Sequence, residues 1–252
     1  MVRKNLSTAF PKATGADISR LLDKVYNHFS LIFIQILTLF AKKKPENVIK
    51  NLKVNGLEIL RRALEKGRGV ILYSAHLGNW ELIPYVLSQE LNTRISSIAR
   101  PMNNPLVERL LLDFRYQMGS RIFYKQGSIR KTIRLLQANH IFYYLIDHNT
   151  VVREGVFVDF FSKKACAITS VAQLHLKMDV CVIPIFLHYE SKSIILNIYD
   201  EVAFEKSGDE KKDILDLTQR FSSLIEKQIR AHPEQWFWFH DRWRTRPPRR
   251  QH

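Results

Sequence analysis

His76 and Glu81 are the residues whose types and spacing best suit acid–base chemistry in this chain; they lie five positions apart in the segment HLGNWE. The apolar run at 70–73 before them is typical of a buried strand. Residues five apart do not share a helical face, so the two side chains can meet only across a turn. Gly78 permits that turn, and Asn79 can cap a helix whose first turn carries Glu81. We predict strand, turn and helix, with His76 as general base and Glu81 orienting its ring.

The same segment also has an ordinary structural interpretation. His76 could satisfy a buried polar contact, and Glu81 could cap a helix without any catalytic role. A pattern this short does not separate the two interpretations, so the rest of the chain must decide between them.

Composition limits the class of protein. The 252 residues are 46% hydrophobic, and no Pro-, Gly- or Ser-rich stretch marks a boundary, so we expect one domain covering 1–252. A formal net charge of +15 favours anionic partners such as nucleic acid, a membrane surface or acidic proteins. Cys166 and Cys181 form no CxxC unit, which argues against a disulfide scaffold or a zinc site and indicates a reducing compartment.

The first long element is predicted to be an amphipathic helix at about 16–41. Apolar residues recur at helical spacing after a capping signal formed by Thr14 and Asp17, and the pattern ends before three lysines at 42–44. The longest apolar stretch, 31–40, has ten residues. A bilayer span needs about 20 residues. The apolar stripe therefore either packs on the core or lies in an anionic membrane surface.

Helical and strand-like patterns alternate through the rest of the chain. This alternation predicts a single-domain layered α/β fold with a largely parallel or mixed central sheet. His76 follows one strand-like run and Asp147 follows another; ligands of such folds bind beyond the carboxyl ends of strands, so both could line one crevice. The predicted helices are 55–66, 80–89, 105–118, 128–138, 168–177 and 209–231, and the strands are 70–74, 94–99, 122–124, 141–146, 156–160, 180–186 and 193–199.

Further polar candidates accompany His76. Arg100 begins a turn that enters a helix, and Arg115 lies on that helix, where its guanidinium could hold an acidic headgroup or stabilise an oxyanion. The alternative for Arg115 is a solvated or salt-bridged side chain. Asp147 and the His148 next to it form no known metal-binding spacing with His76, so we predict no metal.

Two aromatic segments allow two interpretations each. The segment at 156–161 could wall an apolar groove, although aromatic residues more often mark a core strand. The segment at 236–247 interleaves aromatic and cationic residues, which suits an interfacial belt or base stacking, or else a docked tail with solvated arginines.

Together these segments resemble the bacterial lipid A biosynthesis acyltransferases, the late lauroyl and myristoyl transferases of the wider lysophospholipid acyltransferase group. The resemblance covers nearly the whole chain, with its blocks in the family's order. It departs at Ser162, where Gly is common, and at Asp241, where a basic residue is common. The matching blocks are 3–6 (RKNL) with 9–11 (AFP), 76–81, Arg100-Pro101 with Asn104-Pro105, Arg115, Asp147, 156–161 and 236–247.

The resemblance implies transfer of a fatty acyl group from acyl carrier protein to a hydroxyl of a glycolipid. It matches His76 and Glu81 to the family's catalytic HxxxxD/E pair. It makes Arg115 and Asp147 further catalytic candidates. The substrate-binding candidates are Asn79, Arg100, Arg242 and Arg244. No cofactor, metal or nucleic acid is expected.

The lipid acceptor and the location are also expectations from the resemblance. A lipid A precursor is the first candidate, and a phosphoinositide mannoside, a lysophospholipid or an aminolipid is the alternative. The family usually has an amino-terminal transmembrane helix before the block matched at 3–11, whereas this sequence begins at that block. We therefore expect peripheral or weakly anchored contact with the cytoplasmic face of the bacterial inner membrane. A non-catalytic basic module that binds nucleic acid or anionic lipid is the competing class.

Overall fold

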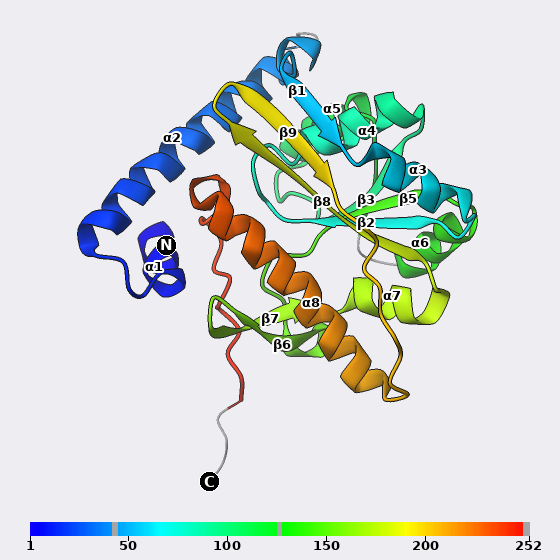
Figure 1. The fold of residues 1–252 in the computed structure, drawn as a ribbon. Coiled ribbons are helices and arrows are strands. Elements are labelled where there is room, and N and C mark those ends of the chain that lie inside the picture. The colour runs from blue at the N-terminus through cyan, green and yellow to red at the C-terminus, as the bar shows by residue number, and fades with distance from the viewer. Residues whose placement is uncertain (42–44, 125–127, 249–252) are drawn as a thin grey trace.

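A seven-stranded sheet with the order β1-β9-β8-β2-β5-β3-β4 forms the centre of the computed structural model (Figure 1). The structure describes residues 1–41, 45–124 and 128–248, so the three lysines at 42–44 lie outside the described residues. All paired strands of this sheet are parallel except β8 and β9, and β6 pairs with β7 in a separate antiparallel hairpin. The strands are β1 (Leu52–Asn55), β2 (Val70–Ser74), β3 (Ile95–Ala99), β4 (Ser120–Tyr124), β5 (Ile141–Leu145), β6 (Gly155–Phe160), β7 (Lys163–Ile168), β8 (Cys181–Glu190) and β9 (Ser193–Ile198).

Helices cover both faces of the sheet, because its central strands are apolar on both sides. Along β2, Ile71 and Tyr73 enter one core and Val70 and Leu72 enter the other. Helices α6, α7 and α8 supply the first core, and α3, α4 and α5 supply the second. The helices are α1 (Val2–Ala9), α2 (Gly15–Phe40), α3 (Leu57–Glu65), α4 (Leu82–Leu91), α5 (Pro105–Gln117), α6 (Ser128–Gln137), α7 (Ser170–Met178) and α8 (Glu210–Ala231), with short 3₁₀ turns η1 (Pro45–Asn47), η2 (Val152–Glu154) and η3 (Pro233–Gln235).

Helix α2 closely follows the predicted range, and the capping box of Thr14 and Asp17 is present. It runs obliquely along one side of the molecule in Figure 1. Its buried residues repeat every seven positions, and Leu21, Leu22 and Phe29 pack partly buried against the same core. The buried residues are Ile18, Val25, Ile32 and Leu39. Within the described residues, no helix combines the length and apolar character that a bilayer crossing needs.

The layered α/β prediction is confirmed, and three elements, α1, β1 and β7, were not predicted. The predicted helix at 80–89 begins later, at Leu82. Strand β1 has four residues with alternating exposure, and β7 begins with two lysines, so neither has the apolar run that marks a strand. Helix α1 has eight residues, too few for a clear helical period.

Both aromatic segments belong mainly to the interior. Phe160 and Phe161 are almost fully buried, which favours the core interpretation of β6 over a groove wall. Trp236 and Trp238 have no exposed surface and join the same core. The interpretation of these tryptophans as an interfacial belt is therefore wrong, because the segment docks against the sheet.

The β6–β7 hairpin predicts a stabilising substitution. Phe161 and Ser162 connect the strands with φ of 53° and 58°, the left-handed region that a two-residue turn of type I′ requires and that glycine tolerates best. Ser162→Gly is expected to raise the free energy of unfolding by about 0.5–1 kcal/mol, measured by urea denaturation. Ser223→Gly, at an exposed position of α8, should instead lower it. A loss of stability in Ser162→Gly would contradict this account of the turn.

Candidate active site

Two neighbouring parallel strands bring His76 and Asp147 together. The register pairs Ser74, the last residue of β2, with Leu145, the last residue of β5. His76 and Asp147 each lie two residues beyond these ends, so the sheet carries both side chains to the same point. The two side chains are in contact, as their positions after neighbouring strands predicted.

The Asp147 carboxylate is fully buried and accepts three hydrogen bonds. Oδ1 lies 2.8 Å from Nδ1 of His76, and Oδ2 accepts from the His76 backbone N–H at 2.9 Å. Oδ2 also accepts from Nε1–H of Trp236 at 2.7 Å. The carboxylate thus holds the His76 ring with its Nδ1 carrying the proton, which leaves Nε2 as the basic nitrogen.

The electrostatics of the pair suit a base. Burial would raise the pKa of Asp147, but the His76 charge and hydrogen bond, together with His240 and Trp236, hold it well below its usual range. Burial would lower the pKa of His76, but the Asp147 charge and hydrogen bond outweigh it and raise the pKa above 6.5. A carboxylate that stays ionised therefore makes the His76 ring more basic.

The Nε2 side of His76 is open. The His76 side chain is 25% exposed, and Nε2 has no protein partner among the described residues. The Trp80 ring lies edge-on to it at 4.8 Å between centroids, and Phe237 and His240 follow at 6.2 Å and 6.4 Å. Three aromatic rings thus pack around the His76 ring.

Glu81 does not hold His76 in this structure, which corrects the predicted pairing. Its carboxylate accepts two hydrogen bonds from Arg115, from Nε at 3.1 Å and from Nη2 at 2.6 Å. Among the described residues Asp147 is the carboxylate hydrogen-bonded to the His76 ring, and Glu81 acts on it only through its charge. The sequence spacing suggested the nearer acid in the chain, whereas the strand register selects the more distant one.

Asn79 has a different contact from the one predicted. Glu81, not Asn79, occupies the position before the first turn of α4, and no side chain caps that end. Asn79 is fully buried, and its amide donates to Oε1 of Gln35 on α2 at 3.0 Å. The same Oε1 accepts from the Tyr189 hydroxyl at 2.6 Å. Asn79 therefore connects the loop after β2 to helix α2 and strand β8.

The loop after His76 is also paired with the C-terminal segment. Leu77 forms an antiparallel bridge with Trp236, and the Phe237 N–H donates to the His76 carbonyl at 2.9 Å. Gly78 has φ of +57°, and a Cβ there would lie 2.5 Å from the Leu187 carbonyl oxygen. The predicted need for glycine at this turn is thus both conformational and steric.

The three remaining substrate-binding candidates lie in different environments. Arg100 is exposed just beyond β3, close enough to influence His148 electrostatically. Arg244 is exposed in the C-terminal segment. Arg242 is 1% exposed and donates to the Cys166 and His148 carbonyls, so it is not the solvated side chain that the sequence suggested. Its contacts order the backbone beside Asp147.

Several supporting residues carry no signal in the sequence. The sequence marks Trp236 as part of an aromatic segment, but nothing in that composition predicts its hydrogen bond to Asp147. Asn5 is buried and donates to the Trp238 and His240 carbonyls at 2.8 Å and 2.7 Å. The Asn5 contacts join residues more than two hundred positions apart, which spacing along the sequence does not reveal.

The family model for bacterial lipid A biosynthesis acyltransferases matches residues 1–245. The chain belongs to this family. The acyltransferase is 24% identical over 238 residues to lipid A biosynthesis acyltransferase 2 of Shigella flexneri, covering 93% of this chain and 74% of the relative. It is 23% identical to the lipid A biosynthesis lauroyltransferase of Escherichia coli K12, covering 98% and 79%. It is 24% identical over 193 residues to the phosphatidylinositol mannoside acyltransferase of Mycobacterium tuberculosis H37Rv, covering 75% and 59%.

Membership makes the protein an enzyme that transfers acyl groups to lipid-like acceptors. It sets aside the competing class of non-catalytic binding module. The candidate site combines an imidazole held by a carboxylate, an open nitrogen on that imidazole and a nearby guanidinium, groups that can serve as base and charge stabiliser in acyl transfer.

The Asp147 contact predicts how His76 titrates. The His76 ring should show a pKa above 6.5 by NMR, while the pKa of His240, which burial lowers, should lie below 6.5 in the same sample. Asp147→Asn should lower the His76 pKa, because the imidazolium loses its anionic partner. A His76 pKa unchanged in Asp147→Asn would contradict the assignment of Asp147 as its partner.

Proposed function

We propose that the protein transfers a fatty acyl group from an acyl carrier protein thioester to a hydroxyl of a lipid A precursor, with His76 as general base. The observation that carries the proposal is the His76–Asp147 pair, which leaves Nε2 open at the end of the sheet. Membership of the lipid A acyltransferase family supports the acceptor class.

The reaction needs one proton movement at Nε2. The acceptor oxygen attacks the thioester carbonyl carbon as its proton passes to Nε2 of His76, and a tetrahedral oxyanion forms. The carbon–sulfur bond then breaks, and the leaving thiolate takes the proton back from His76. Asp147 stabilises the imidazolium between these steps and stays ionised throughout, as its lowered pKa favours.

We assign Arg115 as the cation that stabilises the negative charge of the oxyanion or of an acceptor phosphate. Glu81 binds its Nε and Nη2, which sets the plane of the guanidinium, and Nη1 has no partner among the described residues. The side chain is 21% exposed. Nη1 is therefore available to an oxyanion or to an acceptor phosphate, and Glu81 becomes a positioning residue for Arg115.

The charge of the protein supports the proposed partners. A net charge of +15 favours approach to acidic acyl carrier protein and to phosphorylated lipids. The exposed Arg100 and Arg244 are the candidates for headgroup contacts. A phosphatidylinositol mannoside is the second candidate acceptor, because the mycobacterial relative is named for it.

The outer side of α2 supports peripheral contact with the inner membrane. Beyond its buried stripe it exposes Tyr26, Leu31, Phe33, Ile34 and Leu37. The helix end packs on α5 through stacked Phe40 and Phe114 rings, and α5 exposes Leu106, Val107 and Leu110. Phe29 of α2 also contacts the Phe237 ring beside His76 at 5.4 Å, so this apolar side lies next to the proposed reaction site.

The reaction is tested by mass spectrometry of lipid products from acyl carrier protein thioesters and a panel of acceptors. The panel contains the lipid A precursor, a phosphatidylinositol mannoside, a lysophospholipid and an aminolipid. We expect product with wild type and a loss of about 10²–10⁴-fold or more in His76→Ala and His76→Gln, because general-base catalysis is worth that factor. His140→Ala, which removes a histidine away from the site, should keep wild-type rates.

The pH dependence of the same assay reports the base. Turnover should rise with pH as His76 loses its proton, with a midpoint above 6.5 in wild type. In Asp147→Asn the midpoint should shift to lower pH while the rate falls. Undiminished turnover in folded His76→Gln would refute His76 as the base, and transfer only to another acceptor would refute the lipid A precursor.

Membrane contact is tested with vesicles of phosphatidylglycerol and phosphatidylethanolamine. The double variant Phe33→Ser, Ile34→Ser should bind them roughly tenfold more weakly, because it removes exposed apolar area from α2. The matched control is Leu215→Ser, an exposed leucine on α8. Equal weakening by the control would reject α2 as the contact surface.

A further inference from the structure

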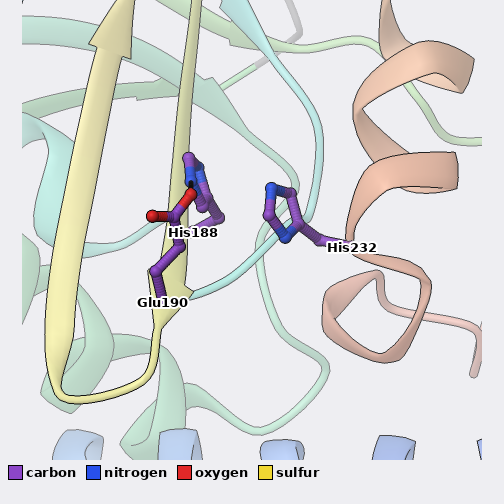
Figure 2. Close-up of side chains that lie close together, drawn as sticks. All are labelled: His188, Glu190 and His232. Atoms are coloured by element: carbon purple, nitrogen blue, oxygen red, sulfur yellow. Dashed lines mark hydrogen bonds and ion pairs between the residues drawn. The ribbon is translucent and has the colours of Figure 1, made fainter.

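A second group of titratable side chains lies at the carboxyl end of β8, and no hydrogen bond joins it to the His76 side chain within the described residues. His188 and Glu190 are on β8, and His232 lies between α8 and η3 (Figure 2). One potential ligand atom from each lies within 4.8 Å of the others, a spacing from which three donors could converge on one metal ion. Figure 2 shows the two imidazole rings facing each other, with the Glu190 carboxylate beside His188.

One nitrogen of His188 already has a partner, because Nε2 lies 2.9 Å from Oε1 of Glu190. The centroids of the His188 and His232 rings are 4.1 Å apart and the planes differ by 20°, so the rings stack closely. Nδ1 of His188 is buried without a hydrogen-bond partner, although the residue is 3% exposed. No hydrogen bond reaches the His232 ring from the described residues. Buried polar atoms without a partner are costly. A metal binds an imidazole at a nitrogen and in the plane of the ring, so one ion can take both residues only after the two rings turn out of the stack.

We propose that His188, Glu190 and His232 bind a divalent transition metal of the zinc type. Two imidazoles and one carboxylate are a donor set that zinc accepts, with a fourth position for water. Magnesium and calcium prefer oxygen donors, so the set disfavours them. Zinc at about 2.0–2.1 Å from each donor holds its ligands roughly 3.3 Å apart, so the separations must shorten and the His232 ring, which has no hydrogen bond to the described residues, must rotate out of the stack. Glu190, whose side chain is 60% exposed, is free to move that far.

The position of the metal gives it a structural role. Tyr189 lies between the two β8 ligands and exchanges two hydrogen bonds of 2.8 Å with the Gln235 side chain. The Gln235 carbonyl accepts from the N–H of Gly78 at 3.0 Å. A metal that joins β8 to the α8–η3 junction would therefore fasten the segment on which the His76 loop rests. This inference does not depend on the identity of the acyl donor or acceptor.

The test uses untagged full-length protein stripped with a chelator and dialysed against Zn²⁺. Metal per chain is counted by mass spectrometry, and the melting temperature is followed in parallel. We expect one zinc per chain, not displaced by excess Mg²⁺, and a melting temperature higher by about 5–10 °C at a hundredfold excess of zinc over its dissociation constant. Co²⁺ in place of Zn²⁺ should give the visible absorption bands of a four-coordinate site.

Two variants test the ligands, and a third serves as the control. His232→Ala should lose the bound zinc and the thermal shift, and Glu190→Gln should weaken binding at least tenfold, with the metal-free melting temperature as a check on folding. His140→Ala should bind like wild type. The proposal is overturned if stripped wild type binds no zinc at saturation or if His232→Ala binds as tightly as wild type. Neither result bears on acyl transfer, which is measured separately.

Discussion

The buried carboxylate of Asp147 is the group on which the arrangement of the site depends. A carboxylate removed from water costs several kcal/mol unless charges and hydrogen bonds compensate it. Here the compensation comes from His76 through its ring and backbone, and from Trp236 through its indole. The two residues that donate come from different parts of the chain, so the burial of one charge requires the loop after β2 and the C-terminal segment to meet at the end of β5.

This requirement explains why so many polar contacts surround the site. Gln35 reaches from α2 to Asn79, which fastens the His76 loop from one side. Gln235 accepts from the Gly78 N–H on the other side, and Asn5 holds the carbonyls of Trp238 and His240. The amino- and carboxyl-terminal segments are therefore part of the support of the site. These hydrogen bonds hold the loop of His76 in position, and none of them involves its open Nε2.

Helix α2 combines two demands that are often met by separate elements. Its residues at seven-position spacing enter the core, and five of its other large apolar side chains are exposed. Gln35 lies on the same helix and accepts a hydrogen bond from Asn79. Helix α2 therefore connects the surface proposed for membrane contact to the loop that carries His76. This arrangement suits an enzyme whose acceptor is a membrane lipid, since the acceptor would arrive beside the base.

The sequence by itself determined the layered α/β fold, the long helix α2 and the positions of His76 and Asp147 after their strands. Apolar runs of period two and stripes of period 3.6 are local properties, and each gives its own element. The resemblance of the blocks gave the family. The sequence also predicted the turn at Gly78 correctly, and the positive φ of that residue explains why glycine stands there.

Only the tertiary structure decided which groups meet. Nearness along the chain favoured Glu81 as the partner of His76, but parallel pairing of β2 with β5 brings Asp147 to the ring and leaves Glu81 to Arg115. The interior places of Trp236 and Arg242, and the meeting of His188 with His232, follow from the packing of α8 and its C-terminal continuation on the sheet. Spacing describes neighbours within one element, whereas contacts between elements depend on strand order and register, which no single segment encodes.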